Sequence, residues 1–282
     1  VVGGDELDPP QFGKVQISIK PKNGTFISDF DKSQIKSKLK SYAVAGINSE
    51  IVDLKILYVE IDSNVYYDPS KVGSPITLRS SVINALQNYA TNVEMNKFGG
   101  RFKYSKVNQL IDRIDDGITS NITKVIIRRD LKALINQFAQ YELCFGNKFH
   151  INTAGYNIKS TGFTISGSSS IAYLTDIPNK DASGNLDGSM KGTISVVSRD
   201  EKNNVQVLLK DAGSVDYKKG EVILNTINIT STVSTNNIIE IQAFPESNDV
   251  IGLKDLFVSL DVSNSSINML KDVIASGEDV SG

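Results

Sequence analysis

Residues 55–68, KILYVEIDSNVYYD, decide how the first half of this chain folds. If the segment is extended, its apolar side chains share one side: Leu57, Val59, Ile61, Val65 and Tyr67. The other side carries tyrosine, acidic and amide groups: Tyr58, Glu60, Asp62 and Asn64. Because the side chains of a strand alternate between two faces, this pattern predicts a long strand with one face in the core.

Helix patterns stand on both sides of this strand in the sequence. Ser74 and Pro75 provide an N-cap and a first-turn proline for a helix. Apolar residues follow at three- and four-residue steps: Leu78, Val82, Leu86, Tyr89 and Val93. Two more helices are predicted, one from Ser28 or Asp31 to Gly46 and one from Ser105 to Gly117.

Short strands are predicted at residues 15–20 and 125–127, where β-branched residues cluster. A single mixed sheet with the three helices packed on it would cover all the apolar faces at once. The fold class predicted for the first half is therefore α+β, with a split βαβ-like arrangement.

The second half has a period of two. Alternation begins at Ala139, and Gly146–Asn147 is predicted to turn the chain back into a strand at Phe149. Later strands are separated by polar loops, which predicts a β-rich domain. We divide the chain into a linker (residues 1–14), an α+β domain (15–131) and a β-rich assembly domain (132–282) that ends in a short helix.

The composition is that of a globular protein with almost balanced charge. The 282 residues include 30 basic and 32 acidic ones, a formal charge of −2. This balance argues against a surface that neutralises many phosphates, and no apolar run approaches the ~20 residues of a spanning helix. We expect neither nucleic acid nor membrane as a partner. The single cysteine, Cys144, permits no intrachain disulfide and no cysteine metal cluster.

Candidate catalytic and metal-binding residues are few. His150 is the single histidine, and no motif supplies it with an aligned partner. Residues 181–188, DASGNLDG, place oxygen donors at alternate positions as a calcium loop does, but Leu186 stands where such a loop needs glycine. Asp112, Asp115 and Asp116 lie at the end of a predicted helix, where acidic residues usually face solvent. We predict no catalytic residue, no metal ligand and no cofactor.

The first residues predict a stiff connection. Val1 is not a translational start, so we expect a segment of a longer protein. Pro9 and Pro10 hold the chain extended, and Gly13 then releases it into the strand at Val15. Pro9, Pro10 and Gly13 are the candidate hinge.

Three stretches carry a resemblance to a known family: GGDELDPPQFGKVQISIKPKNG (residues 3–24), KILYVEIDSNVYYD (55–68) and FGGRFKYSKVNQLIDRIDDG (98–117). Together they resemble the baseplate J-like family of contractile-tailed bacteriophages, and within it the C-terminal region of T-even-type baseplate wedge proteins. The resemblance implies a structural virion protein of the tail baseplate, assembled in the host bacterial cytoplasm. It implies contacts with copies of itself, as a homodimer or ring-forming homo-oligomer, and with other wedge subunits, in a ring around the tail tube that rearranges on sheath contraction. No catalytic residue or cofactor comes with the family.

A candidate interface lies at the C-terminus, on the short helix that Ser265 or Ser266 is predicted to cap. Its apolar residues Ile267, Met269 and Leu270 could contact a neighbouring subunit or pack on their own domain. The alternative function is a carbohydrate-binding or cell-surface-binding β module, which the long polar loops favour. The absence of tryptophan weakens this alternative, because sugars commonly stack on that side chain.

Overall fold

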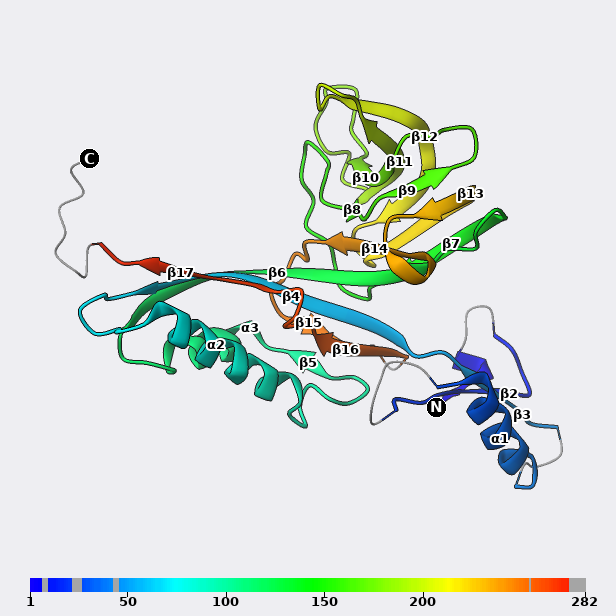
Figure 1. Ribbon diagram of the computed structural model, residues 1–282. Helices are drawn as coiled ribbons and strands as arrows, with labels where there is room; N and C mark the ends of the chain where they lie inside the picture. Colours follow the sequence, from blue (N-terminus) through cyan, green and yellow to red (C-terminus); the bar gives the residue numbers. More distant parts are fainter. Residues whose placement is uncertain (7–9, 22–26, 43–45, 254, 274–282) are drawn as a thin grey trace.

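The structure is a computed structural model that describes residues 1–6, 10–21, 27–42, 46–253 and 255–273 (Figure 1). Its α+β class is as predicted, with a mixed N-terminal sheet and a β-rich remainder. Among the described helices, none is long and apolar enough to cross a membrane.

A small three-stranded sheet forms first. Strand β1 (Val2–Gly3) pairs antiparallel with β2 (Lys14–Ser18), and β2 pairs parallel with β3 (Asn48–Val52). A short 3-10 helix, Gly4–Glu6, follows β1, and α1 (Asp29–Lys40) connects β2 to β3. Ser28 caps α1, as predicted, by accepting a hydrogen bond from the Asp31 N–H at 3.1 Å. Part of the predicted linker is therefore built into this sheet.

A second, larger sheet is built on two long strands, β4 (Lys55–Tyr67) and β6 (Ile118–Lys132), which pair antiparallel. The prediction for β4 is confirmed, since its five apolar residues Leu57, Val59, Ile61, Val65 and Tyr67 are all buried. The prediction of one sheet for the whole first half is wrong, because β2 and β3 pair in the small sheet and not beside β4.

Helices α2 (Pro75–Ala90) and α3 (Tyr104–Asp112) lie along one side of the β4–β6 ribbon (Figure 1). Ser74 caps α2 as predicted, and the buried face of α2 is Leu78, Val82, Leu86 and Tyr89. Val93 is 83% exposed, because α2 ends at Ala90, three residues before it. Strand β5 (Arg101–Phe102) pairs with β15 (Val250–Ile251) as a two-stranded sheet of its own.

The β-rich part closes into a barrel-like ring on the other side of the ribbon (Figure 1). Its strands are β9 (Phe163–Ile165), β10 (Ala172–Pro178), β11 (Lys191–Arg199), β12 (Val205–Asp216) and β13 (Glu221–Thr232). The ring closes because β11 pairs with both β10 and β12, and β9 pairs with both β10 and β13. Strands β8 (Lys159–Ser160) and β14 (Ile238–Ala243) join the ring to β6, and a short 3-10 helix, Thr235–Asn237, precedes β14.

The hairpin predicted at Gly146–Asn147 is not formed. Strand β7 (Phe138–Cys144) pairs with β13, and Phe149 bridges to Pro245. Gly146 does have a positive φ of 63°, as a turn requires, but the chain after it runs to a different partner. The turn signal at Gly146 is therefore confirmed, whereas the strand pairing is determined by residues far away in the sequence.

The predicted C-terminal helix is wrong as well. Residues Ser266–Lys271 form strand β17, which pairs parallel with β4, as does β16 (Leu256–Leu260) further along the same edge. The apolar spacing of Ile267 and Leu270 fits one helix face, but in the strand Ile267 is buried and Leu270 is 38% exposed. The exposed edge of β4 supplies backbone partners that a local pattern cannot reveal. The two C-terminal strands thus return to the sheet of the first half.

Candidate functional site

The sequence-derived candidates for chemistry lie apart. His150 is exposed, and its backbone N–H donates to the Phe244 carbonyl oxygen at 3.0 Å. In the 181–188 loop, Asp181 Oδ1 accepts from the N–H groups of Ser183 at 2.9 Å and Asn185 at 3.0 Å, which makes this carboxylate a turn cap. Within the described ranges, no three His, Cys, Asp or Glu side chains come together as metal ligands.

The acidic residues at the C-terminal end of α3 also stabilise local structure. Asp112 Oδ1 accepts from the Asn121 side-chain amide at 2.7 Å. Asp115 Oδ1 accepts from the Gly117 N–H at 2.8 Å. These three aspartates, Asp116 included, are exposed, in agreement with their placement at a helix end facing solvent.

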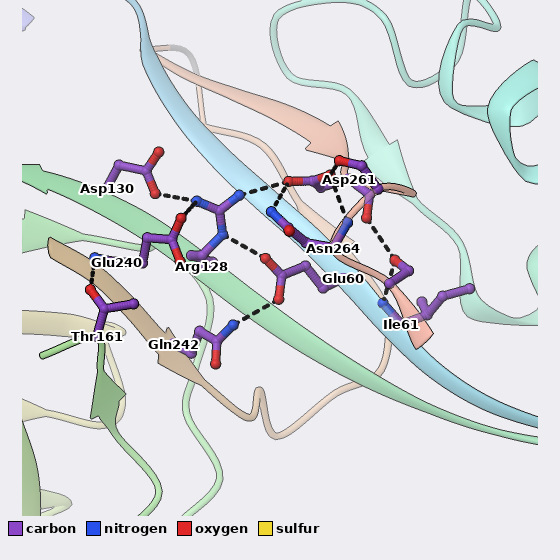
Figure 2. A network of polar contacts seen from close by, with 11 residues as sticks. Glu60, Ile61, Arg128, Asp130, Thr161, Glu240, Gln242, Asp261 and Asn264 are labelled. Carbon is purple, nitrogen blue, oxygen red and sulfur yellow. Dashed lines mark hydrogen bonds and ion pairs between the residues drawn. The ribbon is translucent and has the colours of Figure 1, made fainter. Parts of the chain in front are cut away.

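The most elaborate polar arrangement in the described structure surrounds Arg128 of β6, where the barrel-like ring joins the ribbon (Figure 2). Arg128 is 3% exposed. Its guanidinium donates to Glu60 Oε1 at 2.5 Å, to Asp261 Oδ2 at 2.7 Å and to Glu240 Oε1 at 3.3 Å, and also to Asp130. The guanidinium carbon lies 4.2 Å from the ring centre of Tyr58, a distance that allows a cation–π contact.

A second layer of hydrogen bonds surrounds Glu60, Glu240 and Asp261. Gln242 Nε2 donates to Glu60 Oε2 at 2.8 Å, and the Glu240 N–H donates to Thr161 Oγ1 at 3.0 Å (Figure 2). Asp261 accepts from the side chains of Ser263 at 2.5 Å and Asn264 at 2.9 Å.

The turn between β16 and β17 is tied to β4 in the same region. The Ser265 hydroxyl donates to the Asp261 carbonyl oxygen at 2.6 Å and accepts from the Ile61 N–H at 3.0 Å.

We call the residues around Arg128 the Arg128 clamp: Tyr58, Glu60, Arg128, Asp130, Glu240 and Asp261. The clamp fastens β4, β6, β14 and the β16–β17 turn to one another.

The clamp contains more acidic than basic side chains. One guanidinium faces four carboxylates, a formal sum of −3 from one positive and four negative groups. Burial raises the pKa of Glu60, although Arg128 opposes the shift. Burial acts in the same sense on Asp261, but hydrogen bonds from Ser263 and Asn264, together with Arg128, outweigh it and lower the pKa of Asp261. Burial disfavours the Arg128 cation, but Asp130 and Glu60 outweigh it and raise its pKa, so the guanidinium stays charged.

Sequence reasoning missed the clamp. The alternation places Glu60 on the polar face of β4, and Arg128 directly follows the short strand predicted at residues 125–127. The signal was the strand register, which pairs Tyr58 with Arg128 across β4 and β6 and pairs Arg128 with Gln242 across β6 and β14. That register becomes known only when the sheet is assembled.

The predicted interface residues lie on the outer edge of β17. Ile267 is buried, Met269 is half-buried and Leu270 is exposed. With the first turns of α2 they border a shallow groove of about 490 Å³. Its lining residues are Asn64, Pro75, Ile76, Arg79, Ile267, Asn268, Met269 and Leu270. Within the described part of the chain, β17 pairs only with β4, so the other edge of β17 borders this groove.

The candidate hinge is described only in part. Pro9 lies outside the described residues, and Pro10 is exposed. Gly13 has a φ of 75°, which favours glycine, and its carbonyl oxygen accepts from the Asn48 N–H at 2.8 Å. Gly13 thus joins the start of β2 to the start of β3, and its role as a hinge stays a prediction.

Comparisons with known proteins give a consistent result. Residues 1–52 match the family described as baseplate structural protein gp6, C-terminal domain I. Residues 55–130 match baseplate structural protein gp6, C-terminal domain III. The gap between the matches falls between β3, which ends at Val52, and β4, which begins at Lys55. The chain is also 25% identical over 126 residues to the baseplate wedge protein gp6 of Enterobacteria phage T4; the match covers 44% of this chain and 19% of that protein.

Proposed function

Since this chain is similar over its first 130 residues to the C-terminal region of the phage baseplate wedge protein gp6, a structural protein of the virion tail baseplate, we propose that it works by docking to neighbouring subunits of the baseplate wedge. The two family matches, in order along the chain and meeting between two separate sheets, carry this proposal. The partners that we propose are further copies of the chain and other wedge subunits.

We propose that self-association closes a ring around the tail tube. A closed ring requires either two different contact surfaces on each subunit or alternating two-fold contacts. Ile267, Met269 and Leu270, now part of a strand edge, remain our candidate for a contact with a different wedge subunit. Sedimentation velocity over a range of concentrations tests self-association directly. A sedimentation coefficient that stays at the monomer value at every concentration would contradict it.

We further propose that the ring rearranges when the sheath contracts. Pro9 and Pro10 stand in the sequence between β1 and β2, and this stiffened connection limits how β1 can shift against β2 when the ring rearranges. Replacing Pro9 with Gly and Pro10 with Ser should lower infectivity while leaving the folded chain intact by circular dichroism. The matched control is Pro21→Ser, a proline outside this connection. Equal infectivity and unchanged ring geometry in the Pro9/Pro10 variant would refute a hinge there.

A further inference from the structure

Among the described residues, the outer edge of β17 has no strand partner, and its backbone groups have the spacing that an added strand requires. The Asp272 N–H donates to the Tyr67 carbonyl oxygen at 2.9 Å, so the backbone groups of residue 272 point toward β4. Because successive residues of a strand point their backbone groups to opposite sides, those of Ile267, Met269 and Lys271 point away from β4. The bond from Arg79 Nε to the Ile267 carbonyl oxygen, 2.9 Å, confirms this direction independently.

Apolar side chains border this edge. Ile76, in the first turn of α2, is 78% exposed, and Leu270 is 38% exposed on the other side of β17. Both line the groove described above. An exposed strand edge with apolar walls is the geometry that binds an extended peptide by strand addition.

The charge of the groove decides between possible occupants. Arg79 is the single charged residue among those that line it, and Lys271 follows at the end of β17. The first turn of α2 contains no acidic residue, so its helix dipole adds to the positive potential. Antiparallel pairing of β17 with β17 of a second copy would bring these positive groups together, which disfavours a self-contact at this edge.

We propose that the β17 edge binds an extended, apolar segment of a different polypeptide, which carries one carboxylate placed against the guanidinium of Arg79. The segment pairs with the backbone of Met269 and Lys271, and its apolar residues cover Ile76 and Leu270. Arg79 keeps its bond to Ile267 and uses its remaining N–H groups for the carboxylate. This inference rests on the proposed function only in taking the partner to be a neighbouring baseplate subunit.

The test is a selection from a random nine-residue peptide library, displayed on yeast, against the full chain. Met269→Pro serves as the counter-selection, because it removes an outward N–H that makes no bond to β4, and Met269→Val is the matched control that keeps this N–H. Circular dichroism and thermal unfolding establish that both variants fold. The expected result is enrichment of alternating apolar peptides with one Asp or Glu, bound by the parent and Met269→Val chains and not by Met269→Pro.

An enriched peptide is then measured by fluorescence anisotropy. Changing its acidic residue to the amide should weaken binding about tenfold, the loss of one charge-assisted hydrogen bond. Arg79→Gln should cause a similar loss with the original peptide, and Arg79→Lys should restore part of it. Failure to enrich any peptide over Met269→Pro, or enrichment without an acidic position, would overturn the proposal.

Sedimentation distinguishes this inference from the proposed function. If the parent chain dimerises and Met269→Pro is monomeric, the edge is occupied by a second copy and the inference is wrong, while the assembly role stands. If the chain neither self-associates nor enters tail particles but the edge binds acidic peptides as expected, the baseplate role fails and the site remains.

Discussion

Replacing Arg128 with Met should destabilise the fold more than any other single change in the clamp. Both Arg128 and its partner Glu60 have side chains that are 4% exposed, so the pair is removed from water on both sides. Methionine fills much of the same volume but leaves four carboxylates facing one another without a cation. Breaking a buried ion pair by removing one partner costs about 3–5 kcal/mol, because the other charge remains buried without compensation.

The matched control is Arg129→Met, one residue along the same strand. Arg129 Nη1 donates to the Cys144 carbonyl oxygen at 2.8 Å and makes no ion pair within the described residues. Its replacement removes one charged hydrogen bond, for which about 1.5–3 kcal/mol is expected. Urea unfolding followed by circular dichroism gives the free energy of unfolding of each variant against the parent chain.

The pH dependence adds a second test. Burial already raises the pKa of Glu60 above its ordinary value of 4.5, and without Arg128 to oppose this shift the pKa should rise further. A group whose pKa is raised on folding contributes stability below its unfolded pKa and loses it as the pH rises through the folded value. The loss in free energy of unfolding caused by Arg128→Met should therefore be largest near neutral pH and become smaller toward pH 4.5. The reasoning would be refuted if Arg128→Met lost no more free energy of unfolding than Arg129→Met, or if its loss did not depend on pH.

Two further predictions concern other acidic groups. Asp261→Asn should remove part of the acid sensitivity of the fold: the pKa of Asp261 is lowered below 3.8, so its contribution is present above that value and lost as the pH falls through the folded pKa. Acid unfolding curves that fall in parallel for parent and variant would contradict this. Tyr217→Phe should lower the free energy of unfolding by about 1–3 kcal/mol, because Asp176 loses a buried hydrogen bond. That bond runs from the Tyr217 hydroxyl to Asp176 Oδ2 at 2.7 Å, and both residues are 0% exposed. If Tyr217→Phe is as stable in urea as the parent chain, the hydrogen bond contributes nothing to stability.

Local signals predicted the elements whose stability is local. The α2 helix was predicted correctly because Ser74 caps it and four apolar residues follow at helical spacing. The spacing also predicts strand β4, because alternate residues from Leu57 to Tyr67 are buried on one face of the strand. In both cases the residues that determine the burial pattern lie within fewer than 20 consecutive positions of the sequence.

Long-range pairing accounts for what the sequence did not reveal. The partners of Arg128 in the clamp include Glu60, 68 residues before it, and Asp261, 133 residues after it. The spacing of Ile267 and Leu270 predicts a helix, whereas the conformation of β17 is set by the open edge of β4, about 200 residues earlier in the chain. A window of local sequence contains neither partner.

Cryo-electron microscopy of the tail at side-chain resolution tests the central claim most directly. We expect density in the baseplate that fits the β4–β6 ribbon with α2 and α3 on one side and the barrel-like ring on the other. Subunits in contact with one another around the tail tube would establish the proposed assembly. The account would be contradicted if all the density of the baseplate belonged to other chains. This protein would then lie elsewhere in the virion or be absent from it.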